Sequence, residues 1–481
     1  MSKTLKEKTA TGIIWNFLDK FGQQGIGMLV GIILMRYFLS PDDYGLVALI
    51  AIFNMLGGIL IDSGFTNALI RKKDVTQTDL SSVFYMNLVI SLLFYLLIFF
   101  AAPFIAHFYE KPILIKLIRI MALSLPLYSL SIVQNTLLSK AIDFKRLASS
   151  NLIALFCSGF LSLFLAWKGW GVWVLVVQPI SNVTIKNIYL WCVTSWYPSW
   201  IFSKQSIQDL WKYSSKLLAS STLSIICKNI YTSLMGIYYP LEDVGFYYNA
   251  NRYSEISYQT IIPAIHTAVY PAMTKIENDP EYLKNAFRKT IRVSSFVFFP
   301  IMMGLIAIAE PLIHAVLGPK WLPIAPYFKV ICVGYLFLGI SALYTIILYI
   351  KGKSSPILIF SLLYNIALLV SIAITIRTGV LAMTIGWSVI GVVYTIIFTS
   401  YVSKKIQYTI MEQLKDIFPY FMLAAVMGIG VFLLSLVIKT NLILVTTQII
   451  AGAFFYLFAT YLLGSKVFQE TIRMIKSKTY K

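Results

Sequence analysis

Long apolar stretches alternate with short polar segments along almost the whole chain. Each stretch runs for about 17 to 28 residues, which is enough for a helix to cross the hydrocarbon core of a bilayer. Helices are expected because a backbone in lipid must satisfy its own hydrogen bonds. The pattern therefore predicts an all-α polytopic membrane protein of about fourteen transmembrane helices, at residues 11–37, 44–67, 83–104, 113–138, 151–166, 172–193, 210–238, 244–270, 287–309, 324–350, 357–376, 380–401, 417–438 and 442–463.

A short motif occurs twice, after the first and after the seventh predicted helix. Residues 37–45 and 237–245 share an aromatic residue, then a pair of acids, then a glycine at the same relative positions. Six helices separate the copies, so both lie on one side of the membrane and the halves are predicted to be parallel repeats. This gives an N-terminal lobe of six helices at 1–200, a C-terminal lobe at 201–405, and two further helices with a basic tail at 406–481.

Charge distribution sets the orientation. The chain has 40 Lys and Arg against 20 Asp and Glu, but only 12% of its residues are charged and its mean hydropathy is +0.77. A soluble domain carries about twice that charged fraction. The cations gather in alternate short loops, which predicts a multi-pass protein with both termini in the cytoplasm. They are interpreted as anchors on anionic membrane lipids, and nucleic acid is not an expected partner.

Metal, cofactor and catalytic chemistry are not predicted. The four cysteines lie in different apolar runs and the three histidines are scattered, so neither a metal site nor a disulfide framework is indicated. The pair Asp42-Asp43 is similar to the acidic loop of polytopic glycosyltransferases. Its copy at Glu242-Asp243 indicates a repeat element instead, so we expect a protein that is not an enzyme.

Several predicted helices carry polar stripes. Ionisable groups inside a membrane cost at least about 2.5 kcal/mol, so they point toward a cavity or a partner. In the helix at 244–270 the polar residues advance by three, three, four and seven positions, which keeps them on one face. These residues are Asn249, Arg252, Glu255, Gln259 and His266 in that helix; Asn16, Asp19, Lys20, Gln23 and Gln24 in the first; Lys228 in the seventh; and Asp62 in the second.

One stretch carries a family resemblance. The sequence Leu39-Ser40-Pro41-Asp42-Asp43-Tyr44-Gly45, followed by a long helix that ends in Asp62-Ser63-Gly64-Phe65-Thr66-Asn67-Ala68, resembles the polysaccharide-exporter (Wzx-type flippase) branch of the multidrug/oligosaccharidyl-lipid/polysaccharide (MOP) superfamily. Residues 9–71 look most like colanic-acid-exporter-like lipopolysaccharide biosynthesis proteins.

The resemblance implies a fold, a location and a cargo. The implied fold is a V of two six-helix lobes around a cavity that opens alternately to either side of the bacterial inner membrane. The implied cargo is an undecaprenyl-diphosphate-linked oligosaccharide, exported for surface polysaccharide, lipopolysaccharide or O-antigen synthesis. Helices one, two, seven and eight line the cavity in this family. A polysaccharide polymerase or chain-length machinery is an implied partner.

The polar stripes suit that cargo. Arg252, Lys228 and Lys20 are expected to engage the diphosphate or acidic sugars, because cations make strong hydrogen bonds to phosphate. The amides that face sugar hydroxyls are predicted to be Asn16, Gln23, Gln24, Asn249 and Gln259. Glu255 completes the cavity lining, and Glu255 and Asp62 are the candidates to bind a coupling ion, H⁺ or Na⁺.

Each assignment has a structural alternative. Arg252 and Glu255 have the spacing of an ion pair within one helix. Lys20 can snorkel to the cytoplasmic interface and Lys228 to the outer one. Asp62 can act as a helix cap. His266, between two prolines, has the context of a packing residue.

Three other functions remain open from the sequence. A cation-coupled multidrug or toxin exporter of the same superfamily would carry acids deep in a lobe, whereas most deep charges here are cations. A flippase of the peptidoglycan precursor would differ only in cargo. A polysaccharide polymerase or ligase is disfavoured because such enzymes carry a large periplasmic loop, and the predicted loops are short.

Overall fold

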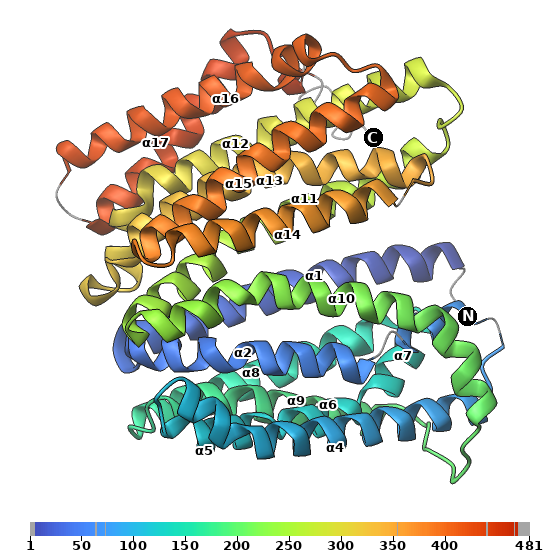
Figure 1. Ribbon diagram of the computed structural model, residues 1–481. Helices are drawn as coiled ribbons and strands as arrows, with labels where there is room; N and C mark the ends of the chain where they lie inside the picture. The colour runs from blue at the N-terminus through green and yellow to red at the C-terminus, as the bar shows by residue number, and fades with distance from the viewer. Residues whose placement is uncertain are drawn as a thin grey trace. The chain divides into compact units, whose positions relative to one another are not determined.

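The computed structural model describes residues 5–62, 65–72, 74–353, 355–438, 441–465 and 467–469. Throughout those residues the chain forms helices joined by short connections, with no β-strand (Figure 1). The chain divides into two compact units, Met1–Gly245 and Phe246–Lys481, and each is described by itself.

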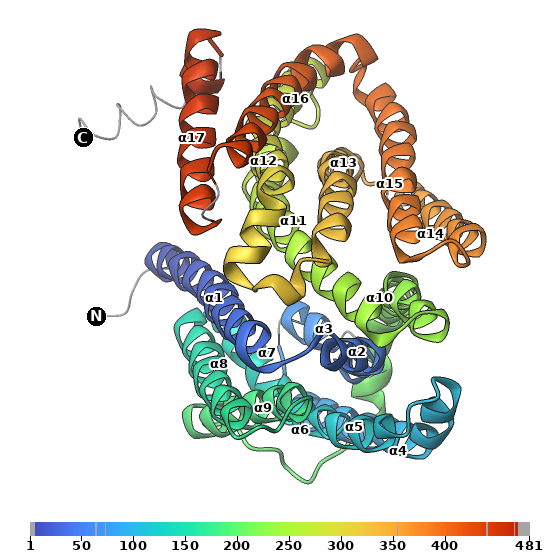
Figure 2. The same cartoon turned by 90° about the vertical axis from the view of Figure 1, so that its left-hand side faces the viewer.

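The first unit is a bundle of long helices with one interrupted member. Its elements are α1 (Leu5–Ile33), the π-helix η1 (Leu34–Phe38), α2 (Pro41–Asp62), α3 (Phe65–Arg71), α4 (Gln77–Phe108), α5 (Ile113–Met121), α6 (Ser124–Ser129), α7 (Ile132–Lys140), α8 (Phe144–Trp167), α9 (Trp173–Val193) and α10 (Lys204–Tyr238). In this bundle α8 packs between α1 and α9, and α10 packs along α2 (Figure 2).

The fourth predicted helix of this unit is broken. The segments Ile113–Ser129 and Ile132–Lys140 meet at an angle of 41°. Backbone groups released at such a break need partners. Two side chains of α9 supply them: the amide of Asn187 donates to the carbonyl oxygen of Leu127 at 2.6 Å, and the indole of Trp191 donates to that of Leu130 at 3.1 Å.

The second unit is also a helical bundle. Its elements are the body of α11 (Leu241–Thr274), α12 (Pro280–Val316), the 3₁₀ helix η2 (Pro319–Trp321), α13 (Ile324–Ile350), α14 (Ser355–Thr375), α15 (Val380–Ser403), η3 (Lys404–Ile406), α16 (Ile410–Leu433), η4 (Leu434–Leu436) and α17 (Asn441–Leu462). Helix α12 packs against α13, α16 and α17, while α13 packs against α15. Buried aromatic residues, among them Phe287, Tyr344 and Tyr408, form part of its core.

The predicted fold class is confirmed. Within the described residues, nine helices are long and apolar enough to cross a membrane, and the bent α5–α7 segment adds a tenth. Four more helices, α1, α9, α10 and α11, have 21 to 35 residues and are long enough to cross a membrane, but they are more polar. Every predicted span overlaps one of these elements, and residues 63–64 of the second span lie outside the described residues, so the structure is compatible with fourteen spans.

The predicted lobe boundaries near residues 200 and 405 stay a prediction. Helix α10, which was expected to begin the C-terminal lobe, belongs to the first unit, where it packs against α2, α3 and α4. Compactness and internal repetition are different properties, so the units do not locate the repeat.

The two copies of the repeat lie against each other at the start of α2 and α11. A Cβ atom added at Gly45 would overlap the carbonyl oxygen of Leu241, and one added at Gly245 would overlap that of Pro41. All four residues belong to the first unit. Because any larger residue would carry that Cβ atom, the close backbone contact requires glycine at both positions.

Candidate functional site

The polar face of α1 is organised around Asp19. Its carboxylate accepts a hydrogen bond of 2.8 Å from the amide of Gln23, one turn further along the helix, and one of 3.0 Å from the amide of Asn151 on α8. Lys20 and Gln24 are exposed beside it, and Asn16 is half-buried. Asp19 thus holds α1 on α8, while Lys20 and Gln24 are accessible to a ligand.

Lys186 on α9 belongs to the same polar region, although the sequence patterns did not predict it as a site residue. It is half-buried and lies within electrostatic reach of the Asp19 carboxylate. A lysine inside an apolar span was the available signal, because such residues mark polar cavities or partners. The polar region of the first unit therefore contains Lys20, Lys186, Asp19 and several amides.

The predicted stripe on α11 mixes buried and exposed groups. Asn249 is fully buried and Glu255 is half-buried, whereas Arg252 and Gln259 are exposed. The Gln259 amide donates to Glu255 at 2.9 Å, and the guanidinium of Arg252 lies 6.0 Å from the ring centre of Tyr253. Arg252 and Gln259 are accordingly the stripe members that a ligand can reach.

His266, also on α11, sits in an aromatic cluster. Its ring stacks on Tyr270 with 5.6 Å between centres and meets the edge of Tyr349 at 6.0 Å. These contacts favour the interpretation of His266 as a packing residue.

Asp62, at the end of α2, has hydroxyl partners. The Thr66 hydroxyl on α3 donates to it at 2.5 Å, and the Thr136 hydroxyl on α7 lies 3.4 Å from that of Thr66. The carboxylate is half-buried. The Asp62–Thr66 hydrogen bond connects the end of α2 to α3. Carboxylate and hydroxyl oxygens are also ligands that small cations bind.

Lys228 lies on α10, but its side chain is outside the described residues. Its predicted contact with an anionic ligand stays a prediction.

A charged cluster that the sequence interpretation missed joins α12 to α16. The Arg288 guanidinium donates to Asp416 at 2.7 Å and to Glu412 at 3.1 Å. Lys284 pairs with Glu412 at 2.9 Å, and Arg292 pairs with Asp416 at 3.4 Å. In the sequence these cations count only toward the loop charge that predicts orientation, because their carboxylate partners lie more than a hundred residues away.

The phenol of Tyr408 completes this cluster. Burial raises the pKa of Tyr408 far above its ordinary value, so its hydroxyl stays protonated. It donates to Asp416 at 2.9 Å. Because Asp416 and its partners satisfy one another, the cluster is a structural connection and is not a candidate ligand site.

The accessible polar groups are suited to an anionic, hydroxyl-rich ligand. Arginine and lysine donate charge-assisted hydrogen bonds to phosphate, and Asn and Gln amides both donate to and accept from hydroxyls. The groups on α1 and α9 belong to the first unit, and those on α11 after Gly245 belong to the second.

The chain is similar in sequence to a known protein family and to proteins of known role. Residues 33–326 match the model of a family described as "Polysaccharide biosynthesis protein". Two curated relatives are similar over most of their length. The succinoglycan biosynthesis transport protein ExoT of Rhizobium meliloti is 28% identical over 75% of this chain and 72% of its own. The teichuronic acid biosynthesis protein TuaB of Bacillus subtilis is 25% identical over 79% of each.

A solved structure extends the likeness to the whole fold. The lipid II flippase MurJ, in an inward closed conformation, matches with a TM-score of 0.77 at 18% identity, over 94% of this chain and 98% of that one. At this identity the similarity concerns the fold. Together with the family match, it confirms the resemblance to MOP-superfamily polysaccharide exporters.

Proposed function

We propose that this chain, which belongs to the polysaccharide biosynthesis protein family, translocates an undecaprenyl-diphosphate-linked oligosaccharide across the bacterial inner membrane. The observation that carries the proposal is the polarity of α1 and α11. These helices are long enough to span a bilayer, yet they expose Lys20, Gln24, Arg252 and Gln259. Such side chains at membrane depth require a wet cavity.

The cargo has two polar parts, and each has candidate partners. Arg252, Lys228, Lys20 and the newly located Lys186 engage the diphosphate or acidic sugars. The amides of Asn16, Gln23, Gln24, Asn249 and Gln259 form hydrogen bonds with sugar hydroxyls. The polyprenyl tail stays in lipid, where it needs no polar partner.

Transport follows an alternating-access cycle. The bound diphosphate favours one of two arrangements of the lobes, and release on the far side restores the other. Asp62 and Glu255 are the groups proposed to bind H⁺ or Na⁺ if an ion gradient drives the cycle. Both termini lie in the cytoplasm, where polysaccharide synthesis begins, and the polymerase or chain-length machinery receives the product.

The names of the relatives support this cargo class over the alternatives. ExoT is named as a transport protein for succinoglycan biosynthesis, and TuaB as a protein of teichuronic acid biosynthesis. Neither of these relatives is named for drug export, so multidrug export is not favoured. The likeness to MurJ at 18% identity concerns the fold alone, so it does not favour the peptidoglycan precursor as cargo.

Transport in inverted membrane vesicles tests the proposal. A radiolabelled lipid-linked repeat unit is added, and its transfer to the lumen is measured. We expect the double variant Arg252→Ala, Lys228→Ala to slow transfer at least tenfold, because two charge-assisted contacts to the diphosphate are lost, at about 1.5–3 kcal/mol each. Arg146→Ala is the control, because Arg146 is an exposed arginine at the start of α8 that pairs with Asp143.

Two results would contradict the proposal. Wild-type transfer rates in the double variant would remove these residues from the cargo site. Transfer of the peptidoglycan precursor at a rate equal to that of the oligosaccharide carrier would instead assign the protein to the alternative cargo.

A further inference from the structure

An aromatic segment that joins α9 to α10 is bound along the first turns of α4. We call residues 196–203 the aromatic strap. The indole of Trp196 donates to the side-chain oxygen of Gln77 at 2.7 Å, and the backbone amide of Ser203 donates to the hydroxyl of Ser82 at 2.8 Å. Hydrogen bonds near both ends thus fix the strap to α4.

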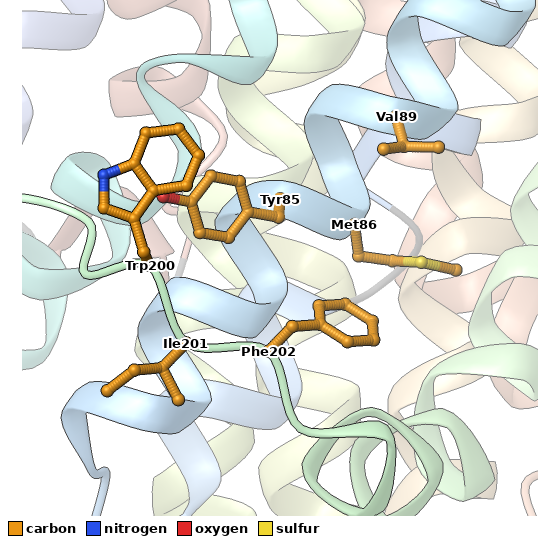
Figure 3. Close-up of a pocket in the computed structure, with 6 residues that line it drawn as sticks. All are labelled: Tyr85, Met86, Val89, Trp200, Ile201 and Phe202. Carbon is orange, nitrogen blue, oxygen red and sulfur yellow. The ribbon is translucent and has the colours of Figure 1, made fainter.

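The strap and α4 line an apolar cavity of about 400 Å³ that is open to the surface (Figure 3). The Trp200 and Tyr85 rings stack at its wall with 5.8 Å between centres, yet Trp200 is 95% exposed. A tryptophan that is held in place and still uncovered is typical of a surface that another molecule covers. The lining residues are Tyr85, Met86, Val89, Trp200, Ile201 and Phe202.

The cavity continues into a lipid-facing surface. Val89, one of its lining residues, begins a row of exposed apolar side chains on α4, followed by Leu93, Leu97, Phe100 and Phe104. Their spacing of three and four residues places them on one helix face. An exposed apolar ridge on a spanning helix is the surface that meets acyl chains, so the occupant of the cavity is an apolar chain that lies along this ridge.

Cations gather where the strap ends. Lys204 follows the strap directly and is exposed, and Lys72, whose side chain is 38% exposed, pairs with Asp79 on α4 at 2.7 Å. Lys140 donates hydrogen bonds to the backbone oxygens of Leu69 and Lys72. Tryptophan and tyrosine are typical of protein surfaces at the membrane interface. Lysines beside them attract anionic head groups.

We propose that the aromatic strap and α4 form a binding site for one anionic glycerophospholipid of the cytoplasmic leaflet, with an acyl chain in the cavity and the phosphate beside Lys204. Apolar continuity with the α4 ridge argues for the chain, and the exposed Lys204 argues for the negative head group, because Lys72 already pairs with Asp79. This site shares no residue with the cargo groups on α1 and α11, so its existence does not depend on what the protein transports.

A second groove provides a matched control. It lies between α14 and α15, has a volume of about 410 Å³, and is lined mainly by aliphatic residues such as Val370 and Val389. Its lining, unlike that of the strap cavity, includes no aromatic residue. Without a tryptophan or tyrosine to hold a lipid at the membrane interface, it should not retain one particular lipid.

Lipid retention measures the difference. The full-length protein is reconstituted in equimolar phosphatidylglycerol and phosphatidylcholine, extracted into mild detergent, and examined by native mass spectrometry. We expect the wild type to retain one phosphatidylglycerol. Val89→Trp, which fills the cavity, should reduce this retention at least fivefold, while Val389→Trp in the control groove should leave it unchanged. Lys204→Glu should abolish the preference for phosphatidylglycerol over phosphatidylcholine.

Trp200→Ala keeps the test decisive if Val89→Trp does not fold. The Trp200 side chain is almost fully exposed, so its removal spares the core. It should also lower retention. Retention equal to wild type in both cavity variants, or an equal loss in Val389→Trp, would overturn the proposal. Displacement of the bound phosphatidylglycerol by added undecaprenyl phosphate would assign the cavity to the cargo tail and would likewise overturn it.

Discussion

Asp416 is 5% exposed, and Arg288, Arg292 and Tyr408 all direct hydrogen-bond donors at it. A carboxylate so far from water is stable only because these donors replace its hydration. Removing one partner while the others stay should therefore lower the free energy of unfolding.

Asp416→Asn is expected to destabilise the second unit. The substitution leaves the partly buried Arg292 without its carboxylate partner and Arg288 with Glu412 alone, which costs up to about 3–5 kcal/mol. The thermal midpoint, measured by size-exclusion chromatography of heated detergent extracts, should fall by several degrees. Asp143→Asn is the matched control, because the Asp143–Arg146 pair at 3.4 Å is largely solvent-accessible and contributes about 1 kcal/mol at most. Equal midpoints for the two variants would show that the cluster does not stabilise the fold.

At the scale of helices, the contact between α2 and α11 leaves no room for a side chain at Gly45 or Gly245. Gly45→Ala should weaken it, because the added methyl group overlaps the carbonyl oxygen of Leu241 and backbone cannot move aside as a side chain can. We expect a loss of about 1–3 kcal/mol in stability. Gly58→Ala on the same helix is the control: nothing lies within 4 Å of its added Cβ, so helix propensity should raise stability by up to about 1 kcal/mol. The thermal midpoint of each variant is measured in heated detergent extracts. Equal midpoints would show that the close backbone contact at Gly45 does not affect stability.

The positions of the helices could be predicted from the sequence, whereas their partners could not. A run of apolar residues long enough for a membrane is a one-dimensional signal, and every predicted span has its helix. The break between α6 and α7 was missed because it falls at Leu130-Ser131, where neither proline nor glycine marks it. Asp19 could be placed on a polar stripe, but its bond to Asn151 joins residues 132 positions apart. Such pairing depends on packing, which helical periodicity does not contain.

The same limit applies to the candidate site. Sequence spacing placed Arg252 and Gln259 on one face of α11, and the structure exposes both. It could not separate them from Asn249, which is fully buried on the same stripe, because burial depends on the neighbouring helices. Lys186 was overlooked for the related reason that its neighbour Asp19 lies on another helix.

For the molecule as a whole, the distribution of cations predicts orientation, and cysteine labelling can test it. In a variant that lacks the native cysteines, Lys168→Cys should react with an impermeant maleimide in intact spheroplasts, whereas Asp74→Cys should react only after the membrane is opened. Both positions are exposed and outside the helices. Reactivity of both residues from the same side would contradict the predicted number of crossings between them, and the reverse pattern would invert the topology.

The glycine contact between the two repeats has an evolutionary consequence. A duplicated segment is ordinarily free to drift once its twin preserves the ancestral role. Here Gly45 and Gly245 each lie against the backbone of the other copy. Neither glycine can therefore change without disturbing the other copy of the motif, and on the predicted duplication we expect the two positions to be retained or replaced as a couple among relatives.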